Sequence, residues 1–405
     1  MARSVLERRP EPQLPGPYLR YERALRQSTP CRPDASATFS TLQRDSSATA
    51  CGMIQCIAHC RPASHPAIQG QDMSRRWCGL WLRSSPRRGR WRQMSVLANR
   101  SVASKTMTNT TFAVGGDIEV RRLGFGAMRI TGPGIWGPPR DRAAARALLR
   151  RAVDLGVQLI DTADAYGPGV SEELIAEALF PYDGLLIATK GGYERTGPSG
   201  ESATGELIGW TPNGRPDHLR SACEASLRRL RLDRIDLYQL HTPDPSVPYA
   251  ESIGALNALR SEGKIRHIGV SNVTPEQLAV ARTITDIATV QNRLNLTNGN
   301  WHDMLTECEL HEIGFIPYRP LRAWDDPAHQ QVLTAAASRL SANTSQIALA
   351  WLLAVSPVTL PIPGTATPAH LEDNLAAAAL QLEQDEIHAI TAEASRATRR
   401  ATQAT

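Results

Sequence analysis

Short apolar runs alternate with longer amphipathic segments along residues 107–405. Short runs with little charge are typical of buried parallel strands, and apolar residues recurring every three or four positions are typical of helices. The predicted strands are 120–128, 157–163, 185–190, 235–241, 267–272, 287–293, 314–320 and 358–364. The predicted helices are 141–156, 171–179, 216–232, 249–262, 275–284, 302–313, 327–340, 344–355, 368–379 and 384–397. Asp141 and Ser171 are expected to cap the first two helices, and Gly156 to end the first.

This order of elements predicts an α/β fold. Strands alternating with helices imply parallel βαβ units, and eight such units fit a closed (β/α)₈ TIM barrel. The alternative is a doubly wound open sheet, which carries a glycine-rich phosphate motif at its first turn. The stretch "GPGIWG" (132–137) matches that pattern, but Pro138 and Pro139 separate it from the next helix and favour a loop. Residues 191–216, rich in Gly, Ser, Thr and Pro, are expected to form a long loop.

Residues 1–106 differ in composition from the rest of the chain. They carry 17 Arg and 1 Lys against 6 Asp and Glu, a net charge of +12, whereas the whole chain is +5. With little periodicity, they predict a largely disordered, Arg-rich extension before a domain at 107–405, or a true start at Met107. The Arg- and Ser-rich start also resembles a transit peptide. Nucleic acid is a partner that such charge suggests, but the mildly acidic remainder argues against it, so none is expected.

Cysteine usage and hydropathy indicate a cytoplasmic protein. Five of the seven cysteines lie in residues 1–106, and the spacing in "CGMIQCIAHC" (51–60) is not that of a zinc site, so no metal is expected. Two cysteines in the remainder predict no disulfide framework. The sequence holds no apolar run of 18 residues, and its first residues lack the apolar segment of a secretory signal, so no membrane partner is expected.

Polar side chains gather at the carboxyl ends of the predicted strands, where barrels place their active sites. Asp161 ends the second strand, Lys190 the third and His241 the fourth, and Tyr166 lies in the loop after the second. An acid, a lysine, a histidine and a tyrosine at one rim indicate a catalytic site rather than four separate structural residues. The same stretch, "LIDTADAYGPG" (159–169), holds a second aspartate, Asp164, which is expected to be a solvated or turn residue.

Six motifs within about residues 118–390 resemble the aldo-keto reductase family. They are "DTADAYG", "IATKGG", "LYQLH", "GKIRHIGVSN", "QNRLN" and "LPIPGTATPAHLEDN". The resemblance implies an oxidoreductase that reduces an aldehyde or ketone to an alcohol with a hydride from NAD(P)H. It also leaves open a non-catalytic, NADPH-binding regulatory subunit of the same fold, and it leaves the oligomeric state open. Short-chain reductases use Y-x-x-x-K, and no lysine here has a tyrosine four residues before it.

The resemblance places the family's catalytic tetrad at Asp161, Tyr166, Lys190 and His241. Reduction of a carbonyl needs a proton for the developing alkoxide, and Tyr166 can donate it. A free phenol has a pKa of about 10, and a nearby cation such as Lys190 is expected to lower it. Asp161 would hold Lys190 charged, because a buried ammonium needs a partner. His241 would orient the substrate carbonyl, as an oxyanion-hole donor does.

The resemblance also assigns cofactor contacts, with NADPH the expected cofactor and NADH the alternative. Ser271, Asn272 and Gln291 match residues that hold the nicotinamide carboxamide, and Tyr318 matches the aromatic that stacks on the nicotinamide ring. The phosphate and adenine side is expected to use residues after the last two strands. They are Arg319, Leu321, Gly364, Thr365, His370, Asp373 and Asn374.

Two of these residues depart from the family's pattern. His370 stands where the family commonly has an arginine for the 2′-phosphate, and an imidazole is only partly charged at pH 7. Arg319 stands where a serine is frequent, and a guanidinium can clamp a phosphate there. The balance still favours NADPH.

Aromatic residues are expected to bound the substrate, a small carbonyl compound that is apolar or planar. They are Trp136, Tyr193 and Trp210, together with the loop at 242–248. The long loop at 191–216 is expected to act as a lid over this site.

Overall fold

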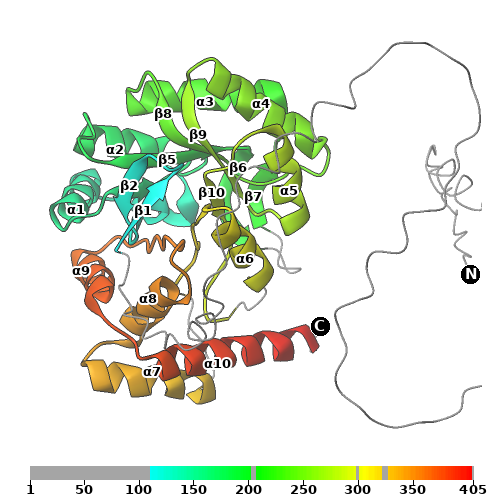
Figure 1. Ribbon diagram of the computed structural model, residues 1–405. Helices are drawn as coiled ribbons and strands as arrows, with labels where there is room; N and C mark the ends of the chain where they lie inside the picture. Colours follow the sequence, from blue (N-terminus) through cyan, green and yellow to red (C-terminus); the bar gives the residue numbers. More distant parts are fainter. Residues whose placement is uncertain (1–109, 202–206, 298–300, 322–326, 404–405) are drawn as a thin grey trace, which may run out of the picture. The chain divides into compact units, whose positions relative to one another are not determined.

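Parallel strands form a curled sheet at the centre of the computed structural model, which describes residues 110–201, 207–297, 301–321 and 327–403 (Figure 1). The sheet order is β11-β10-β9-β8-β5-β4-β3, and every neighbouring pair is parallel. The strands are β3 (Phe125–Gly126), β4 (Leu159–Asp161), β5 (Leu186–Gly191), β8 (Ile235–Leu240), β9 (Ile265–Ser271), β10 (Thr289–Gln291) and β11 (Gly314–Phe315). The predictions for residues 1–106 lie outside the described residues.

The segment 358–364 closes this sheet into a barrel. On one side, Phe315 N donates to Val358 O at 2.8 Å and Leu360 N donates to Phe315 O at 2.7 Å. On the other side, the amides of Gly124 and Gly126 donate to the carbonyls of Pro361 and Pro363 at 2.9 and 3.4 Å. Because proline has no N–H, the segment only accepts hydrogen bonds along that side, which explains why it is not a regular strand. The predicted (β/α)₈ barrel is confirmed, with this segment in the eighth position.

Two glycines make the closing seam possible. A Cβ atom on Gly126 would lie 2.7 Å from the carbonyl oxygen of Ile362, and one on Gly364 would lie 2.6 Å from the carbonyl oxygen of Gly126. Both contacts are with backbone, which cannot move aside as a flexible side chain can. The first and eighth barrel positions therefore approach each other closely just below the rim where the site lies.

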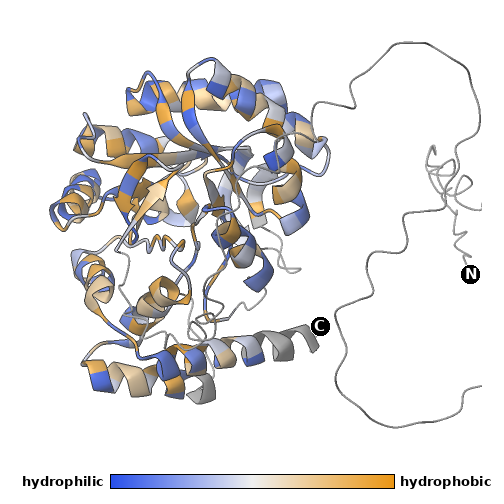
Figure 2. Cartoon of the chain, viewed as in Figure 1, coloured by the Kyte–Doolittle hydropathy of each residue, from blue (hydrophilic) through white to orange (hydrophobic). Residues whose placement is uncertain are grey.

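Helices surround the barrel and carry both orange and blue residues in Figure 2, as expected for helices with one apolar face. They are α1 (Arg142–Asp154), α2 (Val170–Leu179), α3 (Pro216–Leu230), α4 (Tyr249–Ser261), α5 (Pro275–Ile284), α6 (His302–Leu310), α7 (Pro327–Leu340), α8 (Thr344–Val355), α9 (Pro368–Ala376) and α10 (Gln384–Gln403). All ten lie at predicted positions. Asp141 caps α1 as expected, since its carboxylate accepts from Ala144 N at 2.8 Å.

The expected cap at Ser171 is wrong. Helix α2 begins after Gly169, whose φ of 80° is a left-handed conformation that suits glycine. Ser171 Oγ instead accepts a hydrogen bond from Thr162 Oγ1 at 2.8 Å and donates to Ala127 O at 3.1 Å. It therefore ties the helix to the ends of β3 and β4.

An antiparallel hairpin packs against the barrel interior from the amino-terminal ends of the strands. It consists of β1 (Thr111–Val114) and β2 (Ile118–Arg121). Val114 and Val120 belong to the same apolar cluster as Leu159, Leu186 and Leu237, at or near the starts of β4, β5 and β8. The predicted strand 120–128 is therefore wrong in extent, because it joins the end of β2 to β3 and to the 3₁₀ turn that follows. The opposite end of the barrel is the one that opens to ligand.

A second hairpin replaces the loop predicted at 191–216. Strands β6 (Tyr193–Glu201) and β7 (Leu207–Pro212) pair antiparallel, with Tyr193 opposite Pro212 and Arg195 opposite Trp210. Its glycines and prolines read as a loop in sequence, whereas its backbone pairs as two antiparallel strands. Among the described residues, no helix is long and apolar enough to span a bilayer.

Candidate active site

A cavity of about 650 Å³ opens at the carboxyl ends of the barrel strands. Twelve of the predicted site residues line it, from five barrel strands, the closing segment and the β6–β7 hairpin. They are Asp161, Tyr166, Tyr193, Trp210, His241, Ser271, Asn272, Gln291, Tyr318, Arg319, Leu321 and Gly364. The cavity thus brings together three residues of the expected tetrad with most of the residues expected for the cofactor and substrate, whereas Lys190 lies outside its lining.

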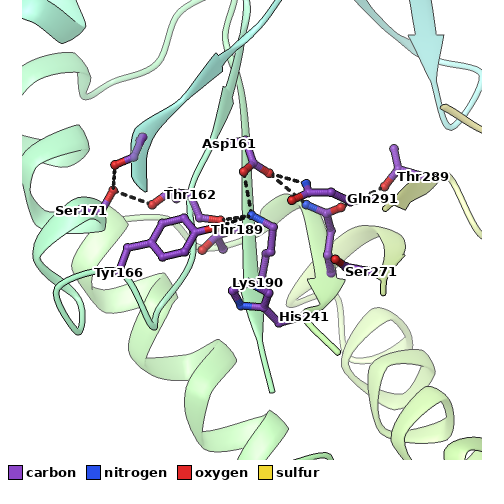
Figure 3. A network of polar contacts seen from close by, with 12 residues as sticks. Asp161, Thr162, Tyr166, Ser171, Thr189, Lys190, His241, Ser271, Thr289 and Gln291 are labelled. Carbon is purple, nitrogen blue, oxygen red and sulfur yellow. Dashed lines mark hydrogen bonds and ion pairs between the residues drawn. The ribbon is translucent and has the colours of Figure 1, made fainter. Parts of the chain in front are cut away.

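Asp161, which lines the cavity, forms an ion pair with Lys190 behind it (Figure 3). Asp161, at the end of β4, accepts a hydrogen bond from Lys190 Nζ on β5 at 2.7 Å through Oδ2. Its Oδ1 accepts from Gln291 Nε2 at 2.8 Å and from Gln239 Nε2 at 3.3 Å. Lys190 is fully buried and Asp161 is 2% exposed. Burial lowers the pKa of Lys190, and the adjacent carboxylate opposes that shift.

Lys190 links this carboxylate to Tyr166. Its Nζ donates to the carbonyl of Thr162 at 2.7 Å and to Tyr166 Oη at 3.5 Å, so its three donors have three acceptors. Tyr166 lies in the turn before α2, where its ring lines the cavity and is 6% exposed. Carboxylate, ammonium and phenol therefore form one hydrogen-bonded chain that ends at the cavity (Figure 3).

The expectation that Lys190 lowers the pKa of Tyr166 is wrong for this structure. Burial, with the negative charges of Asp161 and Asp164, raises that pKa well above 10. The carboxylate of Asp161 lies closer to Lys190 than the phenol does, and it neutralises much of the ammonium's field. At neutral pH the phenol is therefore protonated, which is the form that can donate a proton.

His241 follows β8 and faces Tyr166 edge-on, with 5.8 Å between ring centroids. Burial, with the positive charges of Lys190 and Arg195, holds its pKa well below 6.5, so the imidazole is neutral. Its Nδ1 is buried and has no hydrogen-bond partner among the described residues. A neutral imidazole carries one N–H, so it can donate one hydrogen bond to a carbonyl oxygen in the cavity.

Asp164 lies in a turn, which is one of the two settings expected for it. Its Oδ1 is sealed from solvent and lacks a partner among the described residues. Burial and the nearby carboxylate of Glu172 raise its pKa to about 8, and Arg229 opposes this. Its backbone amide donates to Lys190 O at 3.1 Å. Only Asp161 of the two aspartates contacts the Lys190 ammonium.

The residues expected at the nicotinamide lie together on one wall. Tyr318 Oη donates to Asn272 Oδ1 at 2.7 Å, which holds the tyrosine ring beside the ends of β9 and β10. Asn272 has a left-handed φ of 59° and donates through Nδ2 to His241 O at 3.0 Å. Since these bonds and the bond from Gln291 to Asp161 engage three of the expected groups with protein, the wall is fixed before a ligand arrives.

The residues expected at the phosphates divide into two groups. Arg319, Leu321 and Gly364 line the cavity. Thr365 is buried and accepts from Thr367 N at 3.1 Å. His370, Asp373 and Asn374 lie on α9 outside the cavity lining, with His370 exposed in the first turn and Asn374 buried.

Several lining residues were not predicted. They are Gly126, Met128, Arg129, Ile135, Ser199, Arg293, Pro320, Ile362 and Pro363. Arg129 and Arg293 follow the ends of β3 and β10, so reading every strand end for cations would have found them. Both, with Arg319, are exposed, and Asp161 is the one carboxylate in the lining, already paired with Lys190. This cationic mouth suits the phosphates of a dinucleotide.

Two of the three residues expected at the substrate line the cavity. Tyr193 and Trp210 face His241 edge-on, with ring centroids 4.8 and 6.1 Å away. Trp136 is outside the lining, and its ring lies 5.5 Å from the guanidinium carbon of Arg195. The aromatic wall therefore comes from the β6–β7 hairpin, which was predicted as a loop.

The chain belongs to the aldo/keto reductase family, whose pattern it matches over residues 122–323 and 327–394. It is 46% identical over 292 residues to an uncharacterized oxidoreductase of Schizosaccharomyces pombe, covering 72% of this chain and 92% of that protein. It is 42% identical over 287 residues to pyridoxine 4-dehydrogenase of Escherichia coli, covering 69% and 96%. An aldo/keto reductase from Klebsiella pneumoniae in complex with NADP and acetate has a TM-score of 0.57 at 28% identity, covering 69% and 94%. The protein is therefore an oxidoreductase of carbonyl compounds with a nicotinamide cofactor.

Proposed function

We propose that this protein reduces an aldehyde to an alcohol, with a hydride from NADPH and a proton from Tyr166. The observation that carries the proposal is the hydrogen-bonded chain from Asp161 through Lys190 to Tyr166, with neutral His241 across the cavity. All four groups are buried, and burial keeps the Tyr166 phenol protonated and the His241 imidazole neutral, as the reaction requires. When bound, the reduced nicotinamide supplies the hydride.

In this proposal the cofactor is held along one side of the cavity. Ser271, Asn272 and Gln291 would hold the carboxamide of the nicotinamide, and Tyr318 would pack against its ring. Arg293 and Arg319 meet the phosphates, since their guanidinium groups are exposed at the mouth. NADPH is preferred over NADH, supported by the NADP complex of the Klebsiella pneumoniae relative. His370, on the first turn of α9, then lies toward the 2′-phosphate.

The residues of this chain complete the reduction at the substrate oxygen. Tyr166 Oη and the imidazole of His241 hydrogen-bond to the carbonyl oxygen and polarise it. As the carbon gains the hydride, the phenolic proton moves from Tyr166 Oη to that oxygen and leaves a phenolate. Lys190 Nζ donates to the phenolate, and Asp161 keeps Lys190 charged throughout. The neutral phenol at rest ensures that the proton is present when substrate binds.

Pyridoxal, with pyridoxine as its product, is the substrate that we propose. The name of the Escherichia coli relative, 42% identical to this chain, supports it. The rings of Tyr193 and Trp210 offer flat apolar surfaces beside His241, which suit a planar heteroaromatic aldehyde.

The test measures kcat/KM of the full chain with three aldehydes, each with NADPH and with NADH. The aldehydes are pyridoxal, 4-nitrobenzaldehyde and propionaldehyde. Pyridoxal with NADPH should give the highest kcat/KM, and Tyr166→Phe should lower kcat at least about 100-fold while NADPH still binds. Binding of NADPH without turnover of any aldehyde would favour a regulatory subunit of this fold. A failure of both cofactors to bind would overturn the assignment.

A further inference from the structure

Arg195, on β6, uses every donor of its guanidinium group on backbone carbonyls. Nε donates to Gly209 O at 2.9 Å. Nη1 donates to Ile135 O at 3.1 Å and to Ala165 O at 2.6 Å. Nη2 donates to Gly134 O at 3.3 Å and to Gly197 O at 3.0 Å. All five N–H groups of the arginine are therefore satisfied, in the planar fork that only this side chain provides.

These five carbonyls belong to three separate segments. Two lie in the β6–β7 hairpin, two lie in the turn after β3, and Ala165 O belongs to the peptide bond that joins Ala165 to Tyr166. One half-buried side chain therefore connects the hairpin, the turn after β3 and the turn that carries Tyr166. A movement of any one segment relative to the other two would break bonds to Arg195.

Arg195 also holds an aromatic side chain of the cavity. Its guanidinium carbon lies 3.8 Å from the centroid of the Trp210 ring, within cation–π distance. The same indole ring meets Tyr166 edge-on at 6.3 Å, Tyr193 at 5.3 Å and His241 at 6.1 Å. The arginine thus stacks on Trp210, whose ring in turn contacts Tyr166 and His241.

An isolated two-stranded hairpin is at best marginally stable in water. Strands β6 and β7 pair with each other and with no other strand among the described residues. Contacts other than strand pairing must therefore hold the hairpin over the cavity, and Arg195 supplies three of them, to the carbonyls of Gly134, Ile135 and Ala165. The lid expected at 191–216 stays a prediction.

We infer that Arg195 is a positioning residue, which locks the β6–β7 hairpin as a fixed roof and sets the position of Tyr166. It acts on the reaction through the Ala165 carbonyl and through Trp210, without contact with the reacting atoms. The inference rests on the proposed function for its kinetic consequence. Its structural consequence, a hairpin and a tyrosine turn that loosen together, does not depend on which substrate is turned over.

The first test measures amide hydrogen exchange in the full chain without substrate. Arg195→Met keeps a long apolar stem but removes the fork. It should increase exchange both in β6–β7 and in the turn at 164–169, while leaving α4 unchanged. Arg228→Met, at an exposed position on α3, is the matched control and should change neither. Faster exchange in the hairpin alone, or in neither segment, would overturn the inference whatever the activity.

The second test separates positioning from substrate contact. Arg195→Met should lower kcat at least about tenfold for both pyridoxal and propionaldehyde, since a small displacement of the proton donor is costly. Trp210→Ala should mainly raise KM for pyridoxal, because it removes a wall that the smaller aldehyde does not need. Arg195→Lys keeps three N–H donors but lacks the planar guanidinium group, so its kcat should lie between those of Arg195→Met and the wild-type protein. NADPH binding should stay within about twofold in all variants, which shows that the protein is folded.

Kinetic outcomes that contradict the inference are specific. The inference is refuted if Arg195→Met has a kcat within twofold of the wild-type value and binds NADPH normally. An equal decrease in kcat for Arg195→Met and for the control Arg228→Met would refute it too. If the unchanged protein turns over no aldehyde, the proposed function fails, and the exchange experiment alone decides the structural claim.

Discussion

Asp161→Asn is expected to destabilise the protein, because it removes the negative charge from the buried ion pair of Asp161 and Lys190. The Oδ2 position faces the Lys190 ammonium, and the Oδ1 position faces the amide nitrogens of Gln239 and Gln291. An asparagine must place its NH₂ group at one of these two positions. In either orientation this group, itself a donor, faces the N–H donors of Lys190 or of the two glutamines. In both cases the buried ammonium loses its counter-charge, while Thr162 O still accepts from it at 2.7 Å.

The size of the effect follows from burial of Lys190, which is fully enclosed. Breaking a buried pair by removing one partner costs about 3–5 kcal/mol. The loss in the free energy of unfolding has an upper limit, because Lys190 can release its proton rather than remain charged without a partner. From an ordinary lysine pKa near 10.4, deprotonation at pH 7 costs about 4.6 kcal/mol, at about 1.36 kcal/mol per pH unit. We therefore expect a loss of about 3–5 kcal/mol in the free energy of unfolding, and a kcat at least about 100-fold lower.

The assay is urea unfolding at pH 7 of Asp161→Asn, Lys190→Met and the double variant. The double variant removes both charges, so it should be more stable than the sum of the single losses predicts, by about 1–3 kcal/mol. The exposed pair of Arg151 and Glu372 is the control, with side chains 47% and 51% exposed. Glu372→Gln should cost less than about 1 kcal/mol. Additive losses at Asp161 and Lys190, or a loss no larger than at Glu372, would refute the reasoning.

Three further predictions concern other parts of the molecule. The pKa of about 8 at Asp164 lies above the ordinary 3.8, so the folded state keeps a proton that the unfolded state releases, and stability should fall as pH rises from about 4 to about 8. Asp164→Asn should therefore raise Tm at pH 9 by several degrees more than at pH 5; an equal change at both would contradict this. Gly126→Ala places a Cβ 2.7 Å from a backbone oxygen and should cost about 1–3 kcal/mol on urea unfolding, whereas Gly254→Ala, in α4 with open space, should gain about 0.5–1 kcal/mol. His370→Arg adds a permanent charge and should raise the NADPH-to-NADH ratio of kcat/KM several-fold, and an unchanged ratio would place this residue away from the 2′-phosphate.

The barrel and the tetrad cluster could be predicted because both depend on local signals. Each parallel strand is an apolar run, and each polar side chain of the site follows such a run directly, as Asp161 and Lys190 do. The barrel geometry then brings the carboxyl ends together. Helices α5, α7 and α8 begin and end at the predicted residues. The caps of α5 and α8, Thr274 and Asn343, lie directly before the helices in sequence.

The rest depends on contacts between distant residues. The β6–β7 hairpin is held by Arg195, whose acceptors at 134, 135 and 165 lie far away in sequence. The pKa of Tyr166 depends on burial and on two carboxylates, whereas the sequence suggested only a neighbouring lysine. The raised pKa of Asp164 likewise reflects burial and the charge of Glu172 on α2, which is eight residues away in sequence. The spacing of residues along the sequence does not predict these effects.

The central claim is tested most directly by following the hydrogen atoms of a single turnover. The full chain is mixed with pyridoxal and NADPH carrying deuterium at the transferring position, and the product is analysed by mass spectrometry. We predict pyridoxine with one deuterium on carbon, formed at a rate that Tyr166→Phe lowers at least about 100-fold without loss of NADPH binding. Pyridoxine without deuterium, or an undiminished rate in Tyr166→Phe, would contradict the account.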